Sequence, residues 1–123
     1  MKIKKLKTGI KVALLLLILF LVPVSTAHAA IAFDAASSAT GVGVSSLTWA
    51  HTTSGADRLL IVGVSFDTGT VTGVTYAGVP MTSVGNTTTA LKMHMWRLIA
   101  PATGANNIVV SFSNTGDRVG GAE

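Results

Sequence analysis

The chain has 123 residues, a formal net charge of +4 and no cysteine, which excludes a disulfide framework and a lipid-modified cysteine. Five of the nine basic residues lie before residue 12 and all five acidic residues lie beyond residue 30, so residues 30–123 carry a formal charge of −1. The four basic side chains of that part are scattered, and phosphate-backbone binding needs clustered positive charge. No nucleic-acid partner is therefore expected.

The first part of the chain has the pattern of a cleavable export signal. Five lysines precede an unbroken apolar run of eleven residues, Val12–Val22, and small residues follow at Ala27 and Ala29. As a helix the run would span about 16 Å, well short of the ~30 Å hydrocarbon core. We expect a signal-peptide helix within residues 1–29, cleavage between Ala29 and Ala30, and a secreted or cell-surface protein that meets the membrane only during export. A short uncleaved anchor is the alternative.

Residues 30–123 are expected to form one all-β domain. β-Branched and aromatic residues occur in short runs separated by Gly, Ser, Thr, Asn and Asp, and no stretch has helical periodicity. Such runs, with turn residues every ten or so positions, are typical of an antiparallel β-sandwich or barrel. The expected strands are Ile31–Ala36, Ser45–His51, Arg58–Phe66, Val71–Tyr76, Met81–Val84, Leu91–Leu98 and Asn107–Ser113.

In two of these strands the sequence shows clearly which faces are apolar. In Ser45–His51, Leu47 and Trp49 share one side while polar residues take the other, which predicts that Trp49 belongs to the core. The run Leu59–Val64 is apolar on both sides, which predicts a central strand that is covered on both faces.

The strand Leu91–Leu98 changes its pattern half-way along. Met93 and Met95 alternate with polar residues that include His94, whereas Trp96 continues the apolar pattern on the opposite side. A β-bulge near Met95 or Trp96 would reconcile the two halves, and His94 is then expected to face outward.

Three connections contain turn residues. Asp67–Thr70 suits a hairpin between the two strands that flank it. Ala77–Pro80 suits a tight turn that leads into an edge strand, because Pro80 has no N–H to donate to a ladder. Proline and glycine exclude a helix through Pro101–Asn106.

Four stretches carry a resemblance to a known group of domains: Arg58–Ser65, Val74–Thr82, Met95–Leu98 and Pro101–Val110. They resemble a recurrent, largely uncharacterised β-sandwich module of secreted bacterial multi-domain surface proteins, over most of residues 30–123. The resemblance implies a jelly-roll or Ig-like domain beside adhesion or carbohydrate-handling domains. It implies no active site, and no functional residue is transferred.

Members of that group continue with further strands beyond the point where this chain stops. Gly116–Glu123 ends where another strand begins, so residues 30–123 are expected to be the N-terminal part of a longer domain or protein. Neighbouring domains of the longer chain would then be its partners, and an unpaired strand edge would lie at the end of this chain.

No catalytic residue, cofactor or metal is expected. Gly63–Asp67 approaches the Gly-x-Ser-x-Gly nucleophile elbow around Ser65, but its last position is Asp and no helix follows. His51 and His94 lack metal-ligand spacing. Calcium is the alternative for four aspartates near strand ends, but they show no Asp-x-Asp-x-Asp clustering, which favours a role in turn formation. They are Asp34, Asp57, Asp67 and Asp117.

Two functions remain. The first is a non-catalytic secreted or cell-surface module with a structural or adhesion role and a protein ligand. The second is a carbohydrate-binding module accessory to an extracellular enzyme, with Trp96 and Tyr76 as candidate aromatics for stacking on a polysaccharide. A core of this size takes most of the available aromatic residues, which favours the first.

Overall fold

The computed structural model describes residues 32–87, 89–90 and 92–123. These residues form seven β-strands and no helix, with antiparallel pairing throughout, which confirms the expected all-β class. The expected leader, with Ala27, Ala29 and Ala30, lies outside the described residues. Within them, no helical segment is long and apolar enough to cross a bilayer. The strands are β1 (Ser37–Thr53), β2 (Leu59–Phe66), β3 (Val71–Tyr76), β4 (Val79–Pro80), β5 (Thr82–Thr87), β6 (Lys92–Ile99) and β7 (Gly104–Ala122).

β1 and β7 form one long ladder that bends in the middle. The first half of β1 pairs with residues 118–122 of β7, and its second half pairs with residues 104–111. Between the halves the register shifts twice, at Gly41/Val44 and at Val44/Ser46, and Gly43 adopts a φ of 64° that favours glycine. The predicted strand Ile31–Ala36 is wrong, since residues 32–36 form no strand and β1 begins at Ser37.

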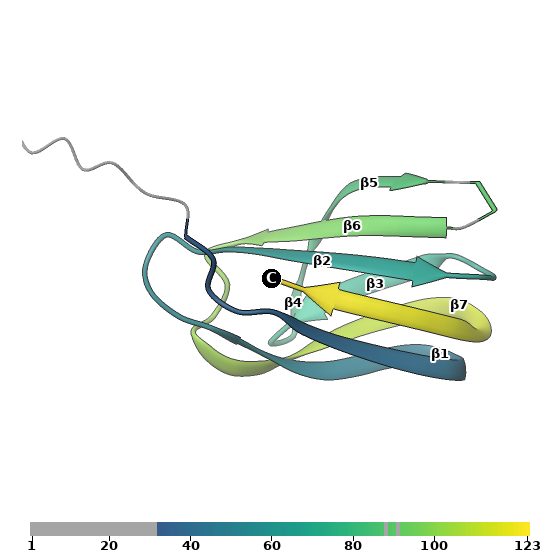
Figure 1. Cartoon of the computed structure of the whole chain (residues 1–123), viewed down its shortest axis with the longest axis horizontal. Coiled ribbons are helices and arrows are strands. Elements are labelled where there is room, and N and C mark those ends of the chain that lie inside the picture. Colours follow the sequence, from purple (N-terminus) through teal and green to yellow (C-terminus); the bar gives the residue numbers. More distant parts are fainter. Residues whose placement is uncertain (1–31, 88, 91) are drawn as a thin grey trace, which may run out of the picture. The chain divides into compact units, whose positions relative to one another are not determined.

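The bend gives the sheet two arms. β2, β6 and β5 continue in that order from residues 118–122 of β7, while β3 and β4 continue from its first half. In Figure 1, β5, β6, β2 and the end of β7 lie side by side, with β3 and β4 behind them. The result is a single curved antiparallel sheet that is nearly barrel-shaped.

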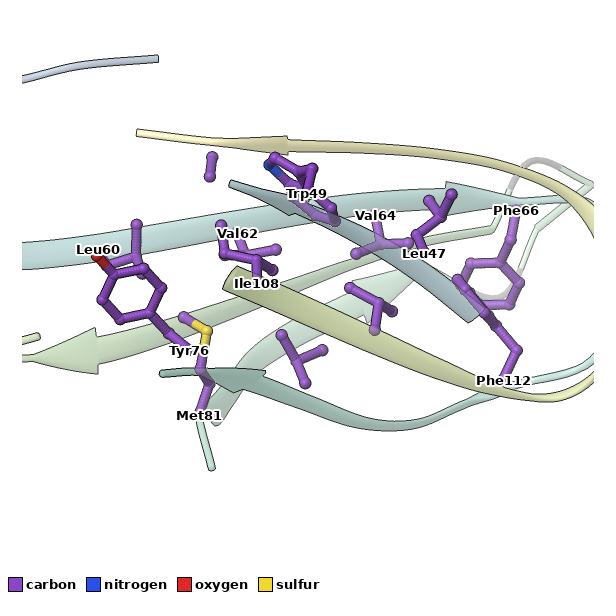
Figure 2. Close-up of a cluster of buried hydrophobic side chains, with 13 residues drawn as sticks. Leu47, Trp49, Leu60, Val62, Val64, Phe66, Tyr76, Met81, Ile108 and Phe112 are labelled. Carbon is purple, nitrogen blue, oxygen red and sulfur yellow. The ribbon is translucent and has the colours of Figure 1, made fainter. Parts of the chain in front are cut away.

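The core fills the space that the curved sheet encloses (Figure 2). Alternate positions of β2 and of the first half of β7 point into it, as the two-residue period of a strand requires. Each fully buried side chain of this size contributes about 1.5–3 kcal/mol, so packing stabilises a chain that has no disulfide. Trp49 is buried, as predicted. The core residues are Leu47, Trp49, Leu60, Val62, Val64, Phe66, Val74, Tyr76, Met81, Ile108, Val110, Phe112 and Ala122.

β2 departs from expectation on its second face. Leu60, Val62 and Val64 are almost completely buried, as expected for a central strand. The opposite side is not covered by the described chain, because Leu59 is 55% exposed and Ile61 only partly buried. The prediction of a strand covered on both faces is therefore wrong within the described residues.

β6 has no bulge at Met95 or Trp96. It pairs with β2 in uninterrupted register over eight residue pairs, from Leu59/Ile99 to Phe66/Lys92. The bulge lies instead in the neighbouring strand β5, between Ser83 and Gly85. His94 therefore shares the inner side with Trp96, while the two methionines of β6 face solvent. The prediction that His94 faces outward is wrong, because its ring packs edge-on against Phe66 with centroids 5.1 Å apart.

The turn predictions have mixed outcomes. The segment Asp67–Thr70 does not close a hairpin, because β7 separates β2 from β3 in the sheet. Ala77 and Gly78 do form a two-residue turn between β3 and β4, and φ is positive at both, as a type I′ hairpin requires. The segment after Pro80 is an edge strand as predicted, although it begins at Thr82 as β5, and Pro80 itself lies in β4, a two-residue strand at the other edge.

The residues near Glu123 do not begin a separate strand. Residues 118–122 continue β7 and lie between the first half of β1 and β2. Glu123 extends this pairing, because its backbone exchanges hydrogen bonds of 2.8 and 3.1 Å with Ile61. The predicted unpaired edge is therefore not at this position, and β5, which pairs only with β6, forms an edge of the sheet instead.

Candidate functional site

An exposed surface with an apolar centre lies on the solvent side of β2, β6 and the end of β7, and we call it the β2–β6 face. Five of its apolar side chains are between 42% and 69% exposed. Contiguous exposed apolar surface of this kind marks an interaction site more often than a bare solvent face. The β2–β6 face comprises Leu59, Ile61, Gly63, Ser65, Met93, Met95, Arg97, Ile99, Val119, Gly121 and Glu123.

The strand register fixes which of these side chains lie beside one another. β6 and β7 flank β2 on its two sides, so each row across the face has a member from β6, one from β2 and one from the chain at the end of β7. The rows are Met93, Ser65 and Val119; Met95, Gly63 and Gly121; and Arg97, Ile61 and Glu123.

The middle row has two glycines, Gly63 and Gly121, beside its methionine, and they leave open space there. A Cβ atom added at Gly63 would meet nothing within 4 Å, and one added at Gly121 would meet only the backbone oxygen of Ser37, at 3.8 Å. Met95, 42% exposed, stands next to this glycine floor. A flexible thioether beside a shallow apolar depression is suited to packing against another surface.

The charges of the face lie on opposite sides of β2. Arg97 projects from β6, and Glu123 follows β7 on the other side of Ile61. Two strand spacings separate them, about 10 Å, and no ion pair joins them in the described structure. Each charge is exposed and available to an outside group.

A polar cluster between the two ends of β1 brings together a serine and a histidine that sequence analysis did not connect. Ser37 Oγ lies 2.9 Å from His51 Nδ1 and accepts a 3.0 Å hydrogen bond from Trp49 Nε1. A serine and a histidine at this distance can act as nucleophile and base if a third group orients the imidazole. Only contacts across 14 residues of one strand reveal this pair, and no local motif indicates it.

The third group is not in place. Asp34 contributes a long-range attraction to His51, but its carboxylate accepts hydrogen bonds of 2.6 Å from both the backbone N and the Oγ of Ser54. These two bonds lower the pKa of Asp34. His51 is only 3% exposed and Ser37 is partly buried, and together they fix the indole of Trp49 against the core.

The two described histidines predict a pH dependence of stability. Burial lowers the pKa of His51 from its ordinary 6.5, outweighing the opposing attraction of Asp34, and burial also lowers the pKa of His94. The unfolded chain therefore takes up protons at a higher pH than the folded chain. We expect the free energy of unfolding to be fully retained above pH 6.5 and to fall as the pH is lowered below it.

Urea unfolding at about pH 7.5 and about pH 5 measures this loss. In the double variant His51→Gln, His94→Gln, the free energy of unfolding should differ much less between the two pH values than it does in the wild-type chain. A wild-type chain that is equally stable at both would contradict the assignment.

Only one of the two candidate sugar-stacking residues remains available. Tyr76 is completely buried, and its hydroxyl lies 3.1 Å from the carbonyl oxygen of Gly104, so its ring has no free face and we withdraw it as a stacking residue. Trp96 is half-buried on the inner side of β6, and its Nε1 is buried without a hydrogen-bond partner.

Of the other residues considered from sequence, Asp67 and Asp117 lie together, since the backbone N–H of Asp117 donates a 3.1 Å hydrogen bond to Asp67 Oδ1. Ser65 lies within the ladder of β2, between Met93 and Val119, and not at a strand-to-helix elbow. Asp67 makes an ion pair of 2.7 Å with Arg118, a buried arginine whose role sequence analysis missed. In the described ranges, no three His, Cys, Asp or Glu side chains gather to hold a metal.

Comparison with protein-family models, with curated proteins and with solved structures found no match for this chain.

Proposed function

We propose that this chain is an exported, non-catalytic β-sandwich module that associates with a protein partner through the β2–β6 face, in a structural or adhesion role. One observation carries the proposal. β2 is apolar on both sides, yet the described chain covers only one of them. Leu59 and Ile99, a directly opposed pair at one end of the face, are 55% and 69% exposed. A partner surface would remove this area from water at about 25 cal/mol per Å².

The assignment to a β-sandwich of jelly-roll or Ig-like type is part of the proposal. Its support is the bend in the β1–β7 ladder, which gives two arms with a shared core between them. The resemblance to surface-protein modules adds the same expectation. The lysine-rich start, the apolar run and Ala27 and Ala29 support export.

The carbohydrate-binding alternative has less support. Stacking on sugars needs aromatic faces that are open to solvent, and of the two candidates only Trp96 is partly exposed. A change in tryptophan fluorescence on titration with soluble polysaccharides, lost in Trp96→Ala, would favour this alternative over the protein-binding module.

Export is tested on the full chain expressed with its leader in a bacterial host. N-terminal sequencing of the exported product should begin at Ala30, since Ala27 and Ala29 occupy the −3 and −1 positions. The variant Ala29→Arg should accumulate as the uncleaved precursor, whereas Ala36→Arg, beyond the cut, should be processed normally. Recovery of an intact wild-type precursor in the cytosol would contradict the export assignment.

The role of the face is tested by the size of the exported chain in the unfractionated extracellular sample. We expect it to elute on gel filtration in a complex larger than a monomer, and Met95→Asp to release a monomer, because a buried unpaired carboxylate is costly at an apolar interface. Thr48→Asp adds the same charge to an exposed position of β1 outside the face and should leave the complex intact. An unchanged complex with Met95→Asp would contradict the proposed function.

A further inference from the structure

We propose that the partner of the β2–β6 face is a second copy of this chain, packed face to face about a two-fold axis parallel to β2. This inference rests on the proposed function and names the occupant of that surface. It follows from the residue rows of the face, which are complementary in shape and charge to the same rows after a rotation by 180°.

The strand order determines what such an axis brings together. Rotation by 180° about a line parallel to β2 places β2 over β2 of the second copy and exchanges the two flanks. β6 therefore lies over the end of β7 of the second copy, and β5 over the first half of β1. Positions along the strands are unchanged by this rotation, so each row meets its own row. An isologous interface must be self-complementary in this sense.

The apolar rows are complementary in shape. Met95 comes to lie over Gly121 of the second copy, where the missing side chain leaves room for the thioether. Met93 comes to lie over Val119 of the second copy, so that two exposed apolar side chains cover each other. Each contact occurs twice because of the symmetry.

The charged row is complementary in sign. Arg97 and Glu123 flank Ile61 at one strand spacing on either side, so the rotation places each over the opposite charge of the second copy. The two resulting pairs lie beside the apolar rows and determine orientation more than affinity. Had the two charges been of the same sign, this axis would have been unfavourable.

The outer rim is polar and small, as interface rims are. Gly85 and Thr87 of β5 continue the two apolar rows on one flank, and Ser38 and Thr40 of β1 continue them on the other. The rotation superposes these two flanks, and at the four named positions they carry no charge and no large side chain.

The area predicts a reversible dimer. Five strands about 4.8 Å apart, with lengths of about 17 to 27 Å in this arm of the sheet, give roughly 500 Å² per copy. This is below the ~800 Å² per partner of a standard-size interface. We therefore expect association in the micromolar range and not a permanent dimer.

The test uses purified exported chain in sedimentation velocity over a series of concentrations. Arg97→Glu and Glu123→Arg should each weaken self-association about tenfold, because each variant places like charges together twice. An equimolar mixture of the two variants should recover the wild-type association, since both charge pairs of a mixed dimer are again complementary. Gly121→Leu, which fills the depression beneath Met95, should abolish association while the chain stays folded.

The outcomes separate this inference from the proposed function. A wild-type chain that stays monomeric at all concentrations, or a mixture that associates no better than either variant alone, overturns the self-association. If the same chain still elutes in a Met95-dependent complex before purification, the proposed function stands with a different protein as its partner. Failure of Met95→Asp to change either measurement removes both.

Discussion

Replacing Gly120 by valine is expected to lower the free energy of unfolding by about 3 kcal/mol. Gly120 lies in β7 between β1 and β2, and the ring of Trp49 packs directly on its backbone. An added Cβ would come within 2.7 Å of Trp49 Cη2 and 3.0 Å of Cζ3. The indole cannot move aside freely, because its Nε1 is bonded to Ser37 Oγ and its ring is buried.

Thermal or urea unfolding monitored by tryptophan fluorescence measures this effect. Gly73→Val is the matched control, because it makes the same replacement in β3 at a position where an added Cβ meets nothing within 4 Å. The control should retain wild-type stability or gain slightly, since valine restricts the unfolded chain and suits a strand. Equal stability of the two variants would contradict the packing of Trp49 on β7.

Replacing Arg118 by alanine is expected to cost about 3 kcal/mol, chiefly through lost packing. The Arg118 side chain is completely buried, and its guanidinium carbon lies 4.4 Å from the centroid of Phe112 and 5.9 Å from that of Phe66. Its Nε has no hydrogen-bond partner, whereas its terminal nitrogens bond Asp67 and Asn114.

Arg118→Met separates packing from charge. Methionine keeps the length of the apolar stem, and Asp67 is 52% exposed, so water can solvate its carboxylate when the arginine is removed. We expect the methionine variant to lose about 1 kcal/mol, well under the alanine variant. If urea unfolding shows the two variants to be equally unstable, the ion pair and its hydrogen bonds, and not the packing on the phenylalanines, dominate at this site.

Local patterns predicted the parts of the fold that depend on neighbouring residues. The all-β class, the burial of Trp49 and the turn at Ala77 and Gly78 follow from alternation and turn chemistry within a few positions. The bend of the β1–β7 ladder cannot be predicted from such local patterns, because it depends on which half of a long strand pairs with which partner strand. The absence of a hairpin after β2 has the same cause, since β7 is inserted from the far end of the chain.

The candidate surface was indicated by the sequence but misinterpreted. The two-sided apolar pattern of Leu59–Val64 predicts a strand covered on both faces, and the structure leaves one of those faces open. In the first half of β6 the pattern predicts the wrong inner side, because Met93 and Met95 are as apolar as Trp96 and Leu98 of the second half. Hydrophobicity alone cannot tell a side that packs inside the chain from one that packs against a partner.

The polar clusters could not have been predicted at all from local pattern. Ser37 meets His51 across 14 residues, and Arg118 meets Asp67 across 51. Both contacts depend on the register of long strands, and no spacing rule for a catalytic or metal motif describes them. Each is explained by packing, on Trp49 in one case and on Phe112 in the other.

Methionine oxidation, read residue by residue by mass spectrometry, tests most directly whether the β2–β6 face is the interaction surface. In dilute chain, Met93 and Met95 should oxidise rapidly while the core residue Met81, 6% exposed, stays protected. With rising concentration of the chain, Met93 and Met95 should become protected as the face is covered. Equal reactivity of Met81 and Met95 would contradict the fold. The interaction surface would be contradicted if Met93 and Met95 stayed fully reactive both at high concentration and in the unpurified exported complex.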